Sequence, residues 1–374
     1  MAPLLFLFLM QAFHEALHKE YQRKGRIMPY VLIPESSTGQ LINIKNPEKT
    51  RGEKCEIGNT LFVDDGAFIF DSREEVKEFL PLIKTTFAKF GVLMHVGLMN
   101  GEGILLPSKT EIMFFPAQPS KLKMSEFTPE PIYFGERNQF HAHYTAEFKY
   151  LGSRLIPTLS DERDIELRIQ QAMTQTHLLD NFWRSSTDVR IKRTLFLAIP
   201  VNTALYGCEY WAMNDKLRKM LAVFYHKCIR RVLDINMYQV EKNHIKNEHL
   251  RNKLCVSDIN DIVTYRQSKF IGRLAQMQQE RLPRRMIGSW LPFPRKKGGQ
   301  VTTIARTFIH TLQEVLGEEK CSKHGQLNEW MHITGEKTNW EKKRKNFLHS
   351  KKSLCSHYGT GSLGNPAIFE WLCQ

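Results

Sequence analysis

The sequence lacks a long apolar run, a paired spacing of cysteines and an excess of acidic residues. Its most apolar stretch, residues 4–10, is too short to cross a bilayer, and neither a basic segment before it nor a clear small-residue cleavage site after it marks a signal peptide. We therefore expect no membrane segment. The seven cysteines show no disulfide framework, which favours a reducing compartment and predicts an intracellular protein, nuclear or cytoplasmic.

The scarcity of acidic residues is confined to one part of the chain. The formal net charge is +14, yet residues 1–150 carry 17 Lys and Arg against 18 Asp and Glu. Residues 151–374 carry 36 against 21, a net charge of +15. Because binding to a polyanion releases its condensed counterions, this asymmetry predicts a nucleic-acid partner for the second part. A basic, solvated surface without a specific partner is the alternative.

Two adjacent carboxylates are the most informative feature of the first part. Asp64 and Asp65 lie in the run Leu61-Phe-Val-Asp-Asp-Gly-Ala-Phe-Ile-Phe70, with apolar residues on both sides. Such a run predicts a hairpin that presents both carboxylates, and Mg²⁺ prefers hard oxygen ligands of this kind. The alternative is a plain turn, because Asp-Gly between apolar runs is a common hairpin signal.

The residues that follow predict alternating helix and strand. Ser72 and Glu75 have the spacing of a capping box, in which Glu75 reaches back to the Ser72 amide. The apolar positions from Val76 to Phe90 predict a helix that Gly91 ends. We expect strands over 92–98 and 109–115, then a hairpin whose turn is Gly152-Ser153. Residues 1–20 predict a further helix, with Pro3 tolerated in its first turn.

Four of these motifs together resemble the palm of a reverse transcriptase of the non-LTR, LINE-like retrotransposon type. They are Ala2-Pro-Leu-Leu-Phe6, Phe62-Val-Asp-Asp65, Lys109 and Phe148-Lys-Tyr-Leu-Gly152. The segment Ala204-Leu-Tyr-Gly-Cys-Glu-Tyr-Trp211 is similar to one that follows such polymerase domains. The resemblance covers most of residues 1 to about 310, and four motifs in order are more specific than one.

The resemblance implies template-directed DNA synthesis by phosphoryl transfer with two Mg²⁺ ions. Asp64 would bind metal directly and Asp65 would support it, while Lys109 would lie near the leaving pyrophosphate; a solvated lysine at the start of a strand is the alternative for Lys109. The partners would be an RNA template, a DNA primer and a dNTP. The following residues would grip the primer end: Phe148, Lys149, Tyr150, Leu151 and Gly152.

The same resemblance implies an incomplete site. The family uses another aspartate from an earlier strand and a Gln-Gly pair, and both would lie before Met1. We therefore expect a fragment of the enzyme with little activity alone, whose full-length parent makes DNA. A non-catalytic nucleic-acid-binding protein derived from a retrotransposon is the alternative.

The resulting fold class is α+β, a partial palm of antiparallel strands and helices followed by a mostly helical, basic region. We predict a palm with its primer-grip hairpin over 1–157, a thumb-like helical region over 158–280 and a basic, partly disordered region over 281–374. A helix capped by Asn214 would face phosphates, as would a basic linker; a merely solvated face is the alternative. The residues proposed for these contacts are Lys216, Lys219, Lys227, Arg230, Arg231, Arg295, Lys296 and Lys297.

Overall fold

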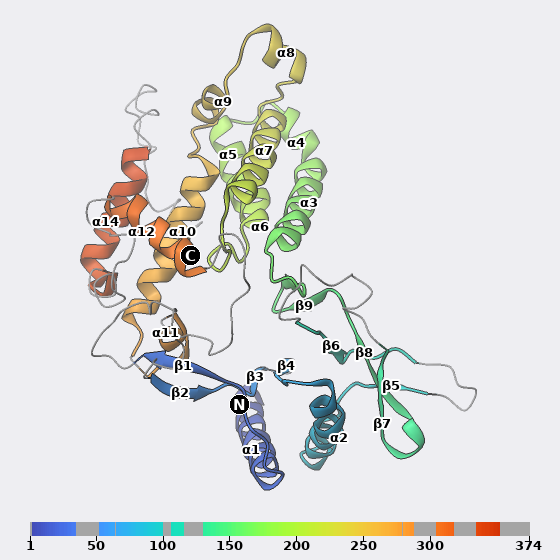
Figure 1. Cartoon of the computed structure of the whole chain (residues 1–374). Helices are drawn as coiled ribbons and strands as arrows, with labels where there is room; N and C mark the ends of the chain where they lie inside the picture. Colours follow the sequence, from blue (N-terminus) through green and yellow to red (C-terminus); the bar gives the residue numbers. More distant parts are fainter. Residues whose placement is uncertain are drawn as a thin grey trace. The chain divides into compact units, whose positions relative to one another are not determined.

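The computed structural model describes residues 2–34, 52–63, 65–99, 106–115, 130–278, 280–287, 304–317 and 334–351. The fold is α+β, as the sequence predicts, with many helices and small, mainly antiparallel sheets (Figure 1). The described residues up to 159 form one compact unit, unit 1, and those from 160 onward form a second, unit 2. Among the described helices, none is long and apolar enough to cross a membrane.

Unit 1 contains two long helices and several short strands. Their bounds are α1 Ala2–Arg23, β1 Tyr30–Pro34, β2 Gly52–Glu56, β3 Asn59–Phe62, β4 Asp65–Phe68, α2 Arg73–Lys89, β5 Gly97–Leu98, β6 Glu111–Ile112, β7 Ile132–Phe134, η4 Glu136–Asn138, β8 Phe140–Tyr144, β9 Phe148–Tyr150 and β10 Ser153–Leu155.

The core of unit 1 forms where α1 meets α2. Phe13 of α1 is fully buried and stacks on Phe87 of α2, with the ring centroids 3.8 Å apart. Val76, Ile83 and Phe87 are buried, so the apolar spacing of α2 predicts its packed face correctly. Ser72 caps the helix by accepting a hydrogen bond from the Glu75 amide. The reciprocal bond differs from the prediction, because Glu75 accepts from the Asp71 amide at 2.8 Å and not from Ser72.

A buried arginine ties this core together. The side chain of Arg26 is 1% exposed and forms an ion pair with Glu75 at 2.5 Å. Its guanidinium also lies 4.4 Å from the ring centroids of Tyr21 and Phe70. Burial of a charge is costly unless it is paired, so Glu75 both helps to order the start of α2 and neutralises Arg26.

The largest sheet is organised around β8. β5 and β7 pair with β8 in antiparallel register, with Gly97 and Tyr133 both opposite His141. β6 pairs with it in parallel. The strands are much shorter than the predicted ranges 92–98 and 109–115, since only two residues of each form a ladder.

Unit 2 is almost entirely helical. Its elements are α3 Glu162–Leu178, α4 Asp180–Arg184, α5 Val189–Phe196, the π-turn η5 Leu197–Val201, α6 Asn202–Ala204, α7 Asp215–Val232, α8 Met237–Lys242, α9 Asn247–Leu254, α10 Ile259–Gln276, α11 Leu282–Ile287, α12 Ile304–Leu316 and α14 Lys337–Lys351.

The main core of unit 2 lies around α7, which packs against α3 and α9 (Figure 1). Pro200 falls within the π-turn η5, which interrupts the α-helical hydrogen bonding between α5 and α6 because proline cannot donate a backbone hydrogen bond. Asn214 caps α7 by accepting from the Leu217 amide at 3.0 Å, which also confirms its prediction.

A second cluster joins α10, α12 and α14, so these parts of residues 281–374 share a core with the helix before them. Trp340 of α14 is buried and its indole N–H donates to the Ser268 carbonyl at 2.9 Å. The ring lies directly over Gly272 of α10, where any β-carbon would overlap it.

Candidate nucleic-acid interface

Helix α7 separates apolar from cationic residues. Leu217, Leu221 and Cys228 lie on its buried face. On the opposite face, Lys219 and Lys227 are exposed, four residues from the exposed Val223 between them. Because side chains three and four residues apart share a helix face, the predicted phosphate contacts on α7 form one stripe.

Both ends of this stripe are tied to the preceding helices by ion pairs. Lys216 pairs with Glu162 of α3. Arg231 donates two hydrogen bonds to Asp180 of α4, one from Nε and one from Nη2. These bonds hold the pKa of Asp180 below its ordinary value and raise that of Arg231. Lys216 and Arg231 are therefore partly neutralised, and each fixes α7 against a neighbour.

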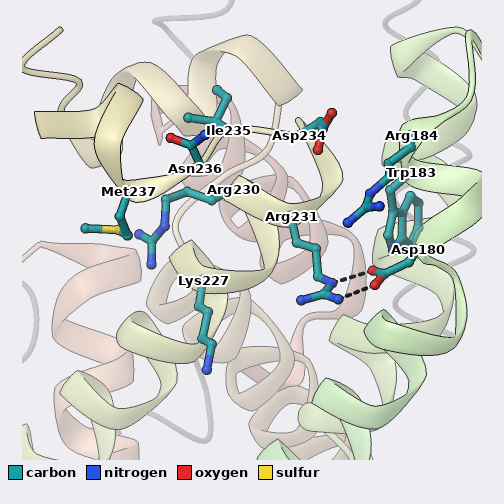
Figure 2. A pocket seen from close by; sticks show the side chains of 10 residues that line it. All are labelled: Asp180, Trp183, Arg184, Lys227, Arg230, Arg231, Asp234, Ile235, Asn236 and Met237. Carbon is teal, nitrogen blue, oxygen red and sulfur yellow. Dashed lines mark hydrogen bonds and ion pairs between the residues drawn. The ribbon is translucent and has the colours of Figure 1, made fainter. Parts of the chain in front are cut away.

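A pocket of about 300 Å³ lies where the end of α7 meets α4 (Figure 2). Arg231 and Asp180 form one wall. The remaining lining comes from Trp183 and Arg184 of α4, from α7 and from the turn that follows it. The lining residues are Asp180, Trp183, Arg184, Lys227, Arg230, Arg231, Asp234, Ile235, Asn236 and Met237.

Three cations of this pocket are available to a ligand. Within the described part of the chain, the side chains of Arg184, Lys227 and Arg230 make neither a hydrogen bond nor an ion pair. Arg184 comes from α4, more than forty residues before the other two. Trp183 beside it is buried, and its indole donates to the Thr176 carbonyl at 2.9 Å, so the backbone that carries Arg184 is anchored in the core.

The aspartate hairpin forms between β3 and β4. Phe62 pairs with Asp65, so the turn begins at Val63 and lies ahead of Gly66. Val63 takes a φ of 55°, a strained conformation for a β-branched residue and one that is concentrated at functional sites. Asp65 is exposed at the start of β4. Asp64 lies outside the described residues.

The predicted primer-grip hairpin also forms, with β9 and β10 joined by Leu151-Gly152, one residue earlier than predicted. Both turn residues have positive φ, at 48° and 87°. Phe148 stacks loosely on Tyr150, whose hydroxyl lies 3.2 Å from Oγ1 of Thr60 in β3. The structure therefore brings this hairpin against the one that carries Asp65, although they are about ninety residues apart in sequence. Lys149 is exposed on the hairpin.

Lys109 lies on the surface near the start of β6. Its backbone amide donates to Nδ1 of His95 at 3.2 Å, and its side chain is exposed. The described residues contain no group of three His, Cys, Asp or Glu side chains that could hold a metal ion. Asp65 alone does not assemble a two-metal site, so the Mg²⁺ site stays a prediction and we derive no catalytic step from it.

Three of the predicted phosphate contacts belong to the basic linker. Arg295, Lys296 and Lys297 lie outside the described residues. Arg184 and Asp180 were not predicted as site residues, because nothing in the local pattern of residues 180–184 indicates that they meet the end of α7. An aspartate three residues before Trp183 and an arginine directly after it were the available signal.

Comparison of the chain with protein-family models, with curated proteins and with solved structures finds no match in any of the three.

Proposed function

We propose that unit 2 binds the phosphates of a nucleic acid through the exposed face of α7 and the adjoining pocket. The observation that carries this proposal is the set of three cations, Arg184, Lys227 and Arg230, whose side chains make no hydrogen bond or ion pair within the described part of the chain. Unpaired surface cations repel one another, so a cluster of them around one pocket indicates an anionic ligand. The net charge of +15 over residues 151–374 favours a polyanion.

We further propose that the chain derives from a retroelement reverse transcriptase of the non-LTR type. Two features support this origin: the strained Val63 beside the aspartates, and the contact between Thr60 and Tyr150, which joins the two hairpins that the resemblance singles out. In that setting the nucleic acid would be an RNA template with a DNA primer. DNA synthesis with Mg²⁺ and dNTP belongs to the full-length parent in this proposal.

The test compares two triple variants of the full chain that remove the same charge. One is Lys219→Gln, Lys227→Gln and Arg230→Gln on α7. The matched control is Lys19→Gln, Lys77→Gln and Lys89→Gln, three exposed lysines of unit 1. Binding to RNA and to an RNA–DNA duplex is measured as a function of salt concentration.

The α7 variant should flatten the dependence of log K on log[salt] by roughly 2 to 3, because each lost phosphate contact removes ~0.7–0.9 from the slope. The control should leave the slope nearly unchanged. Equal losses in the two variants would mean that net charge alone matters, and this result would refute an interface on α7.

A further inference from the structure

The pocket at the end of α7 has a charge that distinguishes it from a general phosphate-binding surface. Four cationic side chains and two carboxylates line it, which leaves a net formal charge of +2 (Figure 2). Asp180 is engaged by Arg231. Asp234 follows α7 with a φ of 51°; its backbone amide donates to the Arg231 carbonyl, and its carboxylate makes no hydrogen bond or ion pair among the described residues.

A phosphodiester carries one negative charge, whereas a phosphate monoester carries about 1.5 to 2 at neutral pH. The net charge of the pocket therefore matches one monoester. A long polyanion laid across the same place would bring further negative charges toward Asp234. The two carboxylates thus limit how much negative charge the pocket accepts, and the three available cations provide donors for the extra phosphate oxygen.

The size of the pocket also favours a small ligand with one phosphate monoester. Its volume of about 300 Å³ lies at the lower end of the range for small-molecule sites. Ile235 and Met237 add apolar surface at one side, where a sugar or base could lie. A nucleotide at the end of a single strand fits this description, while an intact duplex does not enter a space of that size.

We propose that this pocket binds a terminal phosphate monoester, that of a 5′-phosphorylated strand or of a free nucleoside monophosphate. The inference deepens the proposed function and rests on it. Arg184, Lys227 and Arg230 bind the phosphate oxygens, and Arg231 stays with Asp180. The cations come from two helices anchored in one core, which fixes their spacing before the ligand arrives.

The experiment uses the full chain and one single-stranded oligonucleotide prepared with either a 5′-phosphate or a 5′-hydroxyl. The phosphorylated form should bind about tenfold more tightly, a ratio that corresponds to ~1.4 kcal/mol. The double variant Arg184→Gln, Arg230→Gln should bind both forms with the same affinity. The control Lys19→Gln, Lys89→Gln should keep the preference.

Competition then separates the two sources of the phosphate. If AMP abolishes the preference and adenosine does not, the pocket also accepts free nucleotides; if AMP has no effect, only strand ends are accepted, and the proposal holds in both cases. If the wild-type protein binds both oligonucleotides equally, the monoester proposal is wrong, while salt-dependent binding of both would leave the proposed function intact. If neither oligonucleotide binds at low salt, both proposals fail.

Discussion

The two units solve the problem of burying charge in different ways. In unit 1 a single arginine, Arg26, is enclosed by aromatic rings and neutralised by Glu75. In unit 2 the cations of the α7 stripe stay near the surface, and among the described residues only Lys216 and Arg231 of this stripe form ion pairs. The first arrangement stabilises a core and leaves no charge for a ligand. The second keeps charge available, which is the reason for placing the proposed binding site in unit 2.

The largest test of this comparison removes one aromatic ring from each core. Phe13→Ala in unit 1 and Phe196→Ala in unit 2 each delete a fully buried side chain. Each should lower the free energy of unfolding by about 3–5 kcal/mol through lost burial and the cavity that remains.

Hydrogen exchange measures where the loss occurs. Phe13 packs in the cluster of α1 and α2, and Phe196 packs in the cluster around α7. Protection should therefore fall mainly in α2 for the first variant and in α7 for the second. Equal loss throughout the chain in both variants would contradict the division into two cores.

The next test concerns the buried charge of unit 1. Arg26→Ala should destabilise the protein by about 2–4 kcal/mol, because it leaves Glu75 without its partner and removes a group packed on three rings. Lys24→Ala is the control, since Lys24 and Glu78 form an exposed pair whose loss should cost only ~0–1 kcal/mol. Denaturant titration measures the free energy of unfolding of each variant. Similar losses in the two variants would show that the buried pair of Arg26 contributes no more than an exposed one.

The third test changes the charge of the pocket in unit 2. Asp180→Asn should lower stability by only about 0.5–1 kcal/mol, because its pair with Arg231 is partly exposed. It should also tighten RNA binding, since Arg231 becomes available and the pocket gains positive charge. Glu166→Gln removes an exposed carboxylate from the same region of sequence and is the control. Weaker RNA binding by Asp180→Asn alone would show that Arg231 must be held in place to bind.

The smallest effect is expected from pH. Burial lowers the pKa of His226, whose Nε2 lies 2.9 Å from Nη1 of Arg251; Asp258 is the nearby acid. The unfolded chain takes up this proton near pH 6.5 and the folded chain only at lower pH, so stability falls as the pH drops below about 6.5.

The variant His226→Gln isolates this contribution. Its free energy of unfolding should decline less between pH 7 and pH 5 than that of the wild-type protein. Chemical denaturation at several pH values provides the measurement. If the free energies of unfolding of the two proteins change in parallel with pH, the pKa of His226 is the same in the folded and unfolded states.

Local sequence predicted the helices better than the strands. The apolar spacing of residues 76–87 and the cap at Asn214 are both properties of a segment by itself, and the structure confirms them. A strand exists only where a partner lies beside it. Residues 92–98 and 109–115 have suitable composition, yet only two residues of each pair with β8.

The same reasoning explains why two residues of the pocket were not predicted from the sequence. The exposed face of α7 follows from helical periodicity, so Lys219, Lys227 and Arg230 could be selected from sequence. The pocket also needs Arg184 and Asp180, and these arrive through the packing of α4 on α7, which no local pattern encodes. The apolar runs around the aspartates predicted the hairpin, but its positive φ lies at Val63 and not at the glycine of the usual Asp-Gly signal.

Gly272 affects helix α10 in two opposite ways, through its helix propensity and through the packing of Trp340. Replacing it with alanine would favour the helical conformation by roughly 0.5–1 kcal/mol, since alanine has less freedom to lose. The added methyl would at the same time push the Trp340 indole off α10 and, with it, helix α14. An alanine at this position would therefore stabilise the isolated helix and destabilise the folded protein. The attachment of α14 thus depends on the absence of a β-carbon at residue 272.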